Sequence, residues 1–277
     1  VGSEMCIRDS HKIHLIGIGG SGMRAIANIL IQKGYEVSGS DVKESDVIER
    51  FRKMGATVHI GHNADYVQGV DAVVRSTAIR EDNPEIVAAK EQGITILHRS
   101  DIVKAVLDVT NGIAVAGAHG KTSTTSMIGQ ILVEGQMEPT VIIGGEVDYL
   151  KGSSCLGKGE YSVVEADESD GSFLKLRPKM IVITNIEDDH MDHYKTMENL
   201  LNAFCQFVET LPVDGKAVVC GDNDNIRYVM SKVERQFITY GFEESNDYVA
   251  KNIHYEDSSL VYDVVRKGET LSRVSLL

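Results

Sequence analysis

The chain has 277 residues, enough for one large domain or two of ordinary size. Hydrophobic residues make up 42% and charged residues 25%, so the composition excludes wholesale disorder. There are 41 acidic and 28 basic residues, a net charge of −13, and no Lys/Arg run, which argues against nucleic acid or an anionic membrane as the main partner. The four cysteines lack CxxC spacing, and no apolar stretch suits a membrane span or a signal peptide. We therefore expect a soluble protein of the reducing cytoplasm.

Both ends of the chain depart from the pattern of a complete natural domain. Residues 1–10 (VGSEMCIRDS) have no periodicity and precede an abrupt strand, so we expect them to be extraneous to the fold. The final LSRVSLL stops inside a strand-like alternation, which predicts a fragment cut within its last domain.

Residues 11–108 alternate short β-branched runs with helical patterns, which is typical of βαβ units and a parallel sheet. The expected strands are 13–16, 36–39, 57–60, 72–75 and 94–97, and the expected helices are 22–33, 46–54 and 84–92. The pattern predicts an α/β Rossmann-like domain.

A second series of strands and helices starts after Asn111-Gly112, a turn signal that places a domain boundary near residue 109. Strands are expected at 113–116, 141–143, 161–164, 181–184 and 217–220, a long amphipathic helix at 197–210, and a hairpin from 249–255 and 260–265. Residues 109–277 are therefore predicted to form a second, incomplete α/β domain.

The first glycine loop, GIGGSG at residues 17–22, follows the first strand and opens the first helix as a GxGxxG motif. Its glycines let the backbone approach a diphosphate, and the helix N-terminus supplies amide hydrogens. Asp41 ends the second strand, where a dehydrogenase carries its ribose-binding acid. From these residues alone NAD is the default ligand, although any nucleotide diphosphate satisfies the same geometry.

The second glycine loop, GAHGKT at residues 117–122, lies between a strand and a helix and resembles the second half of a P-loop. Lys121 is expected to reach the β- and γ-phosphates of ATP, and the Thr122 hydroxyl to ligate Mg²⁺. Val115 stands where the strict motif has its first glycine, so the loop is a shortened variant.

Two acidic segments follow strands beyond the P-loop, EADESD at 165–170 and NIEDDH at 185–190. Because the carboxyl ends of neighbouring strands meet at one sheet edge, we expect a metal site there. His190 and His193 could suggest zinc, but no cysteine pair accompanies them and their neighbours are oxygen donors, which favours magnesium.

These segments together resemble the Mur ligases of peptidoglycan synthesis. The matching stretches are IHLIGIGGSGM, VSGSD, STAI followed by NPE, GAHGKTSTT, EADESDGSFL and TNIEDDHMDHY, in the family's order from His11 to about Gly241. Within that family, the sequences of these motifs are most similar to those of members that join L-alanine to UDP-N-acetylmuramate with ATP. The resemblance implies that the lactyl carboxylate attacks the γ-phosphate to give an acyl phosphate, which the alanine amine then displaces.

The resemblance also implies roles for individual residues. Contacts to the sugar nucleotide are expected from Gly17, Gly19, Gly20, Ser21, Gly22, Met23, Ser40 and Asp41. Contacts to ATP are expected from Gly117, Ala118, His119, Gly120, Lys121, Thr122, Ser123 and Asn185. Lys121, Glu165 and His190 would be catalytic, and Thr122, Glu165 and His190 would ligate Mg²⁺. Family members continue well beyond Leu277 with a third domain, so we expect this chain to lack residues needed for full turnover.

Three alternatives stay open. The chain could belong to a ligase that adds a recycled tripeptide to the same sugar nucleotide, or it could be a non-catalytic nucleotide-binding fragment. An NAD-dependent oxidoreductase is the third, although it would have no use for the P-loop.

Overall fold

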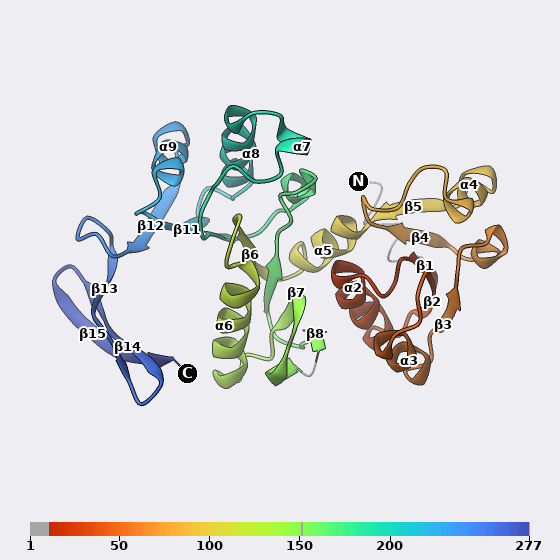
Figure 1. Ribbon diagram of the computed structural model, residues 1–277, viewed down its shortest axis with the longest axis horizontal. Coiled ribbons are helices and arrows are strands. Elements are labelled where there is room, and N and C mark those ends of the chain that lie inside the picture. The colour runs from red at the N-terminus through yellow and green to blue at the C-terminus, as the bar shows by residue number, and fades with distance from the viewer. Residues whose placement is uncertain (1–10, 151, 277) are drawn as a thin grey trace. The chain divides into compact units, whose positions relative to one another are not determined.

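The computed structural model describes residues 11–150 and 152–276, so the segment expected to be extraneous lies outside the described residues (Figure 1). The described chain forms two compact units. The first holds the residues up to Gly112 and Thr125–Glu165, and the second holds Ile113–Thr124 and the residues from Ala166 onwards. The limits of these units differ from the predicted domain boundary near residue 109. That boundary falls between a helix and a strand, and it stays a prediction.

The first unit begins with a parallel five-stranded sheet in the order β3-β2-β1-β4-β5. Its strands are β1 (Lys12–Ile16), β2 (Glu36–Asp41), β3 (Thr57–Ile60), β4 (Ala72–Arg75) and β5 (Thr95–His98). Its helices are α2 (Ser21–Gln32), α3 (Asp46–Lys53), η1 (Ala64–Val67), α4 (Pro84–Glu91) and α5 (Arg99–Leu107). The chain leaves the central β1 toward β2 on one side and later reaches β4 on the other, so the carboxyl end of β1 is a topological switch point.

The core of this sheet follows from its sequence. Ile16 on β1, Val73 on β4 and Ile86 on α4 are fully buried in one apolar cluster. Helix α4 begins where the Asn83 side chain accepts the Glu85 amide hydrogen and Pro84 occupies the first turn. These local signals place Glu85 on the inner face of the helix.

A buried polar network lies beside this core. Glu85 is fully buried, and its Oε2 lies 2.9 Å from His14 Nε2 and accepts the Ser40 hydroxyl at 2.7 Å. Its Oε1 lies 2.9 Å from His62 Nδ1 and accepts the amide hydrogen of Asn63 at 3.3 Å. Burial alone would raise the pKa of Glu85, but the hydrogen bonds from His14, Ser40 and His62 outweigh it and lower the pKa. The network connects β1, β2 and α4 next to the first glycine loop.

Three further strands belong to the first unit, β7 (Thr140–Val147), β8 (Gly152–Cys155) and β9 (Tyr161–Glu165). Strand β7 pairs antiparallel with β8 and parallel with β9, and η2 (Asp148–Leu150) joins β7 to β8. Asn28 on α2 donates to the carbonyl oxygen of Ser154 at 2.9 Å, and the Ser154 hydroxyl donates to the carbonyl oxygen of Ala25 at 3.0 Å. Helix α2 is therefore bonded to β8 by side chain and backbone.

The second unit contains seven strands in the order β15-β14-β13-β12-β11-β10-β6. They are β6 (Asn111–Ala116), β10 (Met180–Ile183), β11 (Lys216–Cys220), β12 (Gln236–Gly241), β13 (Tyr248–Glu256), β14 (Ser259–Arg266) and β15 (Glu269–Leu276). Pairing is parallel from β6 to β13 and antiparallel from β13 to β15. The helices are η3 (Ser172–Lys175), α7 (Met191–Tyr194), α8 (Met197–Glu209) and α9 (Asp224–Lys232), while α6 (Lys121–Glu134) starts in this unit and ends in the first.

These elements confirm the predicted α/β class, and the predicted strands and helices agree with the observed ones within one or two residues, except that β7 continues four residues beyond the predicted 141–143. The hairpin of β13 and β14 is also confirmed, and Asp257 and Ser258 in its turn both have positive φ. Apart from the short 3-10 helices, five of the described elements were not predicted: α5, β8, α7, α9 and β12. The strand-like alternation of the final LSRVSLL corresponds to β15.

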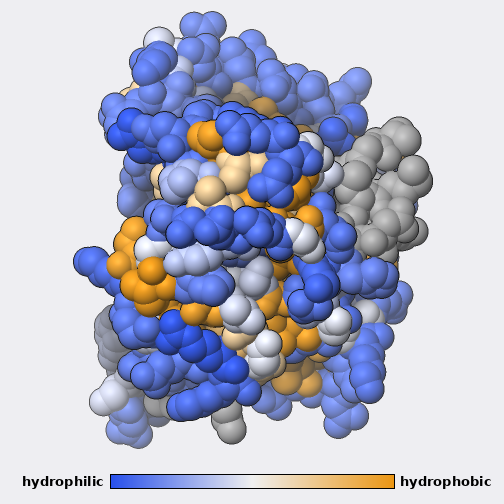
Figure 2. Space-filling view, turned by 90° about the vertical axis from the view of Figure 1, so that its right-hand side faces the viewer, coloured by the Kyte–Doolittle hydropathy of each residue, from blue (hydrophilic) through white to orange (hydrophobic). Residues whose placement is uncertain are grey.

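The face in Figure 2 is covered mainly by hydrophilic side chains, with apolar areas between them. Among the described residues, no helix has the length and apolar character to cross a membrane. Cys155, Cys205 and Cys220 are free thiols. Burial raises the pKa values of the Cys155 and Cys205 thiols, so neither is primed as a nucleophile.

Candidate active site

The P-loop connects β6 to α6 and turns on two glycines. Gly117 has φ +133° and Gly120 has φ +83°, conformations that residues with a Cβ rarely adopt. A Cβ at Gly117 would lie 2.2 Å from the Thr184 hydroxyl oxygen, so the loop also needs glycine for space. Helix α6 starts at Lys121 and has no acidic residue in its first turn. Its N-terminal amides and partial positive charge therefore favour an anion such as phosphate.

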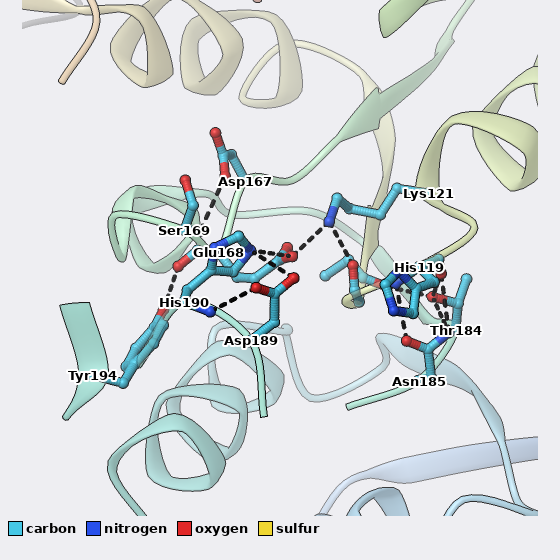
Figure 3. A network of polar contacts seen from close by, with 12 residues as sticks. His119, Lys121, Asp167, Glu168, Ser169, Thr184, Asn185, Asp189, His190 and Tyr194 are labelled. Atoms are coloured by element: carbon cyan, nitrogen blue, oxygen red, sulfur yellow. Dashed lines mark hydrogen bonds and ion pairs between the residues drawn. The ribbon is translucent and has the colours of Figure 1, made fainter. Parts of the chain in front are cut away.

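Asn185 holds the loop from the neighbouring strand. Strand β10 pairs with β6 so that Ile183 lies opposite Ala116, which places the residues after β10 beside the loop. The Asn185 Oδ1 accepts the amide hydrogen of His119 at 2.9 Å, and its Nδ2 donates to the carbonyl oxygen of His119 at 3.0 Å. The structure thus brings Asn185 to the predicted ATP loop, where it fixes the backbone by a double hydrogen bond (Figure 3).

Lys121 points to a buried carboxylate that the sequence interpretation did not assign to the site. Its Nζ donates to the carbonyl oxygen of Gly117 at 2.5 Å and to Glu168 Oε1 at 2.5 Å. Glu168 is only 1% exposed, and the ring nitrogen Nε2 of His190 lies 3.6 Å from the same oxygen. Lys121 and His190, both predicted, therefore meet at Glu168 (Figure 3).

The backbone around Glu168 is fixed. The amide of Ala166 donates to the carbonyl oxygen of Val115 on β6 at 2.8 Å, and the Tyr194 hydroxyl donates to the carbonyl oxygen of Glu168. Burial and the carboxylates of Glu168 and Asp170 raise the pKa of Tyr194, which keeps this hydroxyl protonated as a donor. The EADESD segment held a signal for Glu168, but sequence alone could not tell which of its carboxylates points to the P-loop lysine.

The predicted metal ligands lie on three different elements. Thr122 is in the first turn of α6 and His190 caps α7 in a left-handed conformation, with φ +59° and its amide hydrogen donated to Asp189 Oδ1. Glu165 ends β9 in the first unit and has a buried Oε1 without a hydrogen-bond partner in the described structure. No three His, Cys, Asp or Glu side chains among the described residues cluster as a preformed metal site. A magnesium ion here would need oxygen ligands from nucleotide and water, as is usual for this ion.

The first glycine loop also has the geometry of an anion site. Gly20 caps the N-terminus of α2, and Gly17 adopts φ +73°. The amide of Gly19 donates to Asp41 Oδ2 at 2.9 Å, so the predicted Asp41 is held against the loop. Ser21 begins α2, and all five residues belong to the predicted sugar-nucleotide site.

Two other residues predicted for this site have buried side chains. Ser40 is fully buried and its hydroxyl donates to Glu85, while its carbonyl oxygen accepts the amide hydrogens of Gly17 and Ile18. Met23 is 3% exposed. The Ser40 side chain therefore points from β2 into the polar network while its carbonyl oxygen contacts the loop, and the expected contact of Ser40 with the sugar nucleotide stays a prediction.

Arg99 lies close to the first glycine loop and was not singled out from the sequence. It is the first residue of α5, and a Cβ at Gly22 would lie 2.5 Å from its Nη1. Glycine at position 22 therefore lets a guanidinium approach the diphosphate-type loop. The signal was its place directly after the carboxyl end of β5, at the same sheet edge as the loop.

Comparison with known proteins agrees with the family resemblance. Residues 12–109 match the model described as "Mur ligase family, catalytic domain", and residues 115–277 match "Mur ligase middle domain". UDP-N-acetylmuramate–L-alanine ligase of Desulfatibacillum aliphaticivorans is 43% identical over 97% of this chain, and that of Aromatoleum aromaticum is 45% identical over 96%. The chain spans 59% and 56% of the lengths of these two relatives.

Solved structures give the same result. The UDP-N-acetylmuramate–alanine ligase of Thermotoga maritima has a TM-score of 0.86 at 29% identity, covering 96% of this chain and 60% of its own. The UDP-N-acetylmuramate:L-alanyl-γ-D-glutamyl-meso-diaminopimelate ligase of Neisseria meningitides has a TM-score of 0.87 at 26% identity, covering 95% and 86%. On the matches of both its parts, the chain belongs to the Mur ligase family.

Proposed function

We propose that the chain is the nucleotide-binding part of a cytoplasmic ligase that joins L-alanine to UDP-N-acetylmuramate at the expense of ATP. The observation that carries this proposal is the pair of glycine loops, each at the carboxyl end of a parallel strand and the start of a helix. A ligase that activates a sugar-nucleotide acid with ATP needs both loops. The relatives at 43–45% identity, which share the name of the alanine ligase, support this choice over the tripeptide ligase.

The chemistry assigned to the site is phosphoryl transfer followed by acyl transfer. The lactyl carboxylate oxygen forms a bond to the γ-phosphorus as the bond to ADP breaks, and the alanine nitrogen then attacks the acyl phosphate and releases phosphate. Lys121 would neutralise charge on the transferred phosphoryl group, and Asn185 would keep the loop amides in place. Catalysis of this kind depends on positioning and electrostatics rather than on a covalent enzyme intermediate.

Magnesium fits this site. Its proposed ligands in the second unit are Thr122 and His190, as the resemblance to the family implies, and Glu168 has a second carboxylate oxygen, Oε2, that is buried without a partner in the described structure. When bound, the ion would withdraw charge from the phosphate oxygens. The hydroxyl and carboxylate oxygens suit this ion, whereas the imidazole of His190 is a less usual ligand for it, and no cysteine is needed.

Isothermal titration of the 277-residue chain tests the proposal. We expect UDP-N-acetylmuramate and ADP with Mg²⁺ to bind, and NADH not to bind. Binding of NADH in place of the sugar nucleotide would instead support the oxidoreductase. Binding of ADP alone would reduce the proposal to a nucleotide-binding fragment.

A further inference from the structure

The Lys121–Glu168 ion pair is the most buried charged contact in the described part of the P-loop site. Glu168 is 1% exposed, and the side chain of Lys121 is 20% exposed. The lysine ammonium uses two of its three hydrogens, on Glu168 Oε1 and on the carbonyl oxygen of Gly117. The other oxygen of the carboxylate, Oε2, is buried without a hydrogen-bond partner among the described residues. Lys121 therefore supplies most of the positive charge and hydrogen bonding that offset the burial of the Glu168 carboxylate.

Nucleotide binding must disturb this pair. The P-loop lysine is the group that contacts the β- and γ-phosphates, so the phosphates compete with Glu168 for the same ammonium. If Lys121 turns to the phosphates, a buried carboxylate loses its counter-ion. If Lys121 is shared, the phosphates still bring negative charge next to a carboxylate in a site of low dielectric. In both cases the carboxylate opposes an anionic nucleotide that arrives without a cation.

We propose that Glu168 couples nucleotide binding to a divalent cation: it weakens binding of the free nucleotide and favours the nucleotide–cation complex. A divalent cation adds the positive charge that the site lacks once Lys121 is engaged, and the unpartnered Oε2 gives Glu168 an oxygen that can face it. His190 adds a ring nitrogen 3.6 Å from Oε1 on the same side chain. The inference deepens the proposed function and rests on its assignment of ATP to this loop.

A purely structural role for Glu168 makes a different prediction. If Glu168 only anchored Lys121, its replacement would weaken nucleotide binding by the same factor with and without the cation. The two roles therefore differ in the ratio of the two dissociation constants, and this ratio is independent of turnover.

The experiment is a calorimetric titration of ADP into the 277-residue chain, once with excess MgCl₂ and once with EDTA. For each variant, the coupling factor is the Kd in EDTA divided by the Kd with Mg²⁺. In Glu168→Gln, ADP should bind about tenfold or more tightly than the wild type in EDTA, and the coupling factor should fall by a similar amount. The matched control is Glu198→Gln, which changes an exposed carboxylate on α8 of the same unit. Its coupling factor should stay within about twofold of the wild type.

Either of two results in these titrations would overturn the inference. An unchanged coupling factor in Glu168→Gln, or weaker binding by the same factor in both buffers, would leave Glu168 as an anchor only. Equal ADP affinity of the wild type in MgCl₂ and EDTA would also refute it, and this test needs no variant to fold. Circular dichroism melts show whether Glu168→Gln folds. If the wild type binds no ADP in either buffer, the ATP assignment fails as well, so the two failures are distinguishable.

Discussion

Replacing Glu85 by glutamine would test the buried network below the first glycine loop. The carboxylate accepts hydrogen bonds on both oxygens, with His14 and Ser40 at Oε2 and with His62 and Asn63 at Oε1. An amide keeps only one acceptor oxygen, so its NH₂ group must face donors on one side. Hydrogen bonds to a charged group contribute about 1.5–3 kcal/mol each, and a buried unsatisfied group costs about 1–3 kcal/mol. Allowing for reorientation of the Ser40 hydroxyl, we expect a loss of about 2–4 kcal/mol in the free energy of unfolding.

The assay is urea unfolding followed by circular dichroism at pH 7, with Glu91→Gln as control. Glu91 is exposed near the end of the same helix, so its replacement should change stability by no more than about 0.5 kcal/mol. The folded-state pKa of Glu85 lies below its ordinary value of 4.5, so its ionisation stabilises the fold at pH values above 4.5. This contribution is lost as the pH falls through the folded-state pKa. The difference between wild type and Glu85→Gln should therefore shrink below about pH 4.5.

A stability loss below about 0.5 kcal/mol in Glu85→Gln would refute this reasoning. It would mean that the network rearranges around the amide without losing hydrogen bonds. A large loss that does not shrink in acid would assign the effect to packing rather than to the charge of Glu85.

Two further substitutions test the P-loop and the core of the second unit. Gly117→Ala places a Cβ 2.2 Å from the Thr184 hydroxyl oxygen, so ADP binding measured by calorimetry should weaken at least about tenfold. Gly34→Ala, which has φ +86° but open space around it, should leave ADP affinity unchanged. Phe173→Ala removes a fully buried ring whose centroid lies 4.6 Å from that of Phe207, and urea unfolding should show a loss of about 3–5 kcal/mol. A loss no larger than that of Phe242→Ala, which replaces a 71% exposed residue, would contradict this packing argument.

Local sequence signals were sufficient for most of the secondary structure. The alternation of apolar residues located the five strands of the first sheet, because each strand is short, β-branched and bounded by turn residues. Helix α5 was missed because its N-cap is His98, which forms a capping box with Asp101 and is not one of the usual capping residues. Helix α9 was missed although the Asn223 side chain is an ordinary N-cap, because the surrounding segment is dominated by turn residues.

The site could be predicted as a set of segments but not as a geometry. Both glycine loops and the strand-end position of Asn185 followed from the order of strands, loops and helices along the chain. The sequence could not show that Ser40 points into the core, because this depends on where Glu85 lies 45 residues later. It also could not show that Lys121 pairs with Glu168, since the two are 47 residues apart and meet only through sheet pairing.

The register between β6 and β10 is what makes the P-loop site possible. Ile183 lies opposite Ala116, so the Thr184 hydroxyl and the Asn185 amide both reach the carbonyl oxygen of His119. Thr184 and Asn185 directly follow β10, so a shift of this register by one residue would move both side chains away from the carbonyl oxygen of His119. The buried runs of both strands fix the register against such a shift, because neither apolar face can be turned to solvent without loss of core burial. The apolar core of the second unit therefore determines the conformation of the phosphate-type loop, although no core side chain needs to touch a ligand.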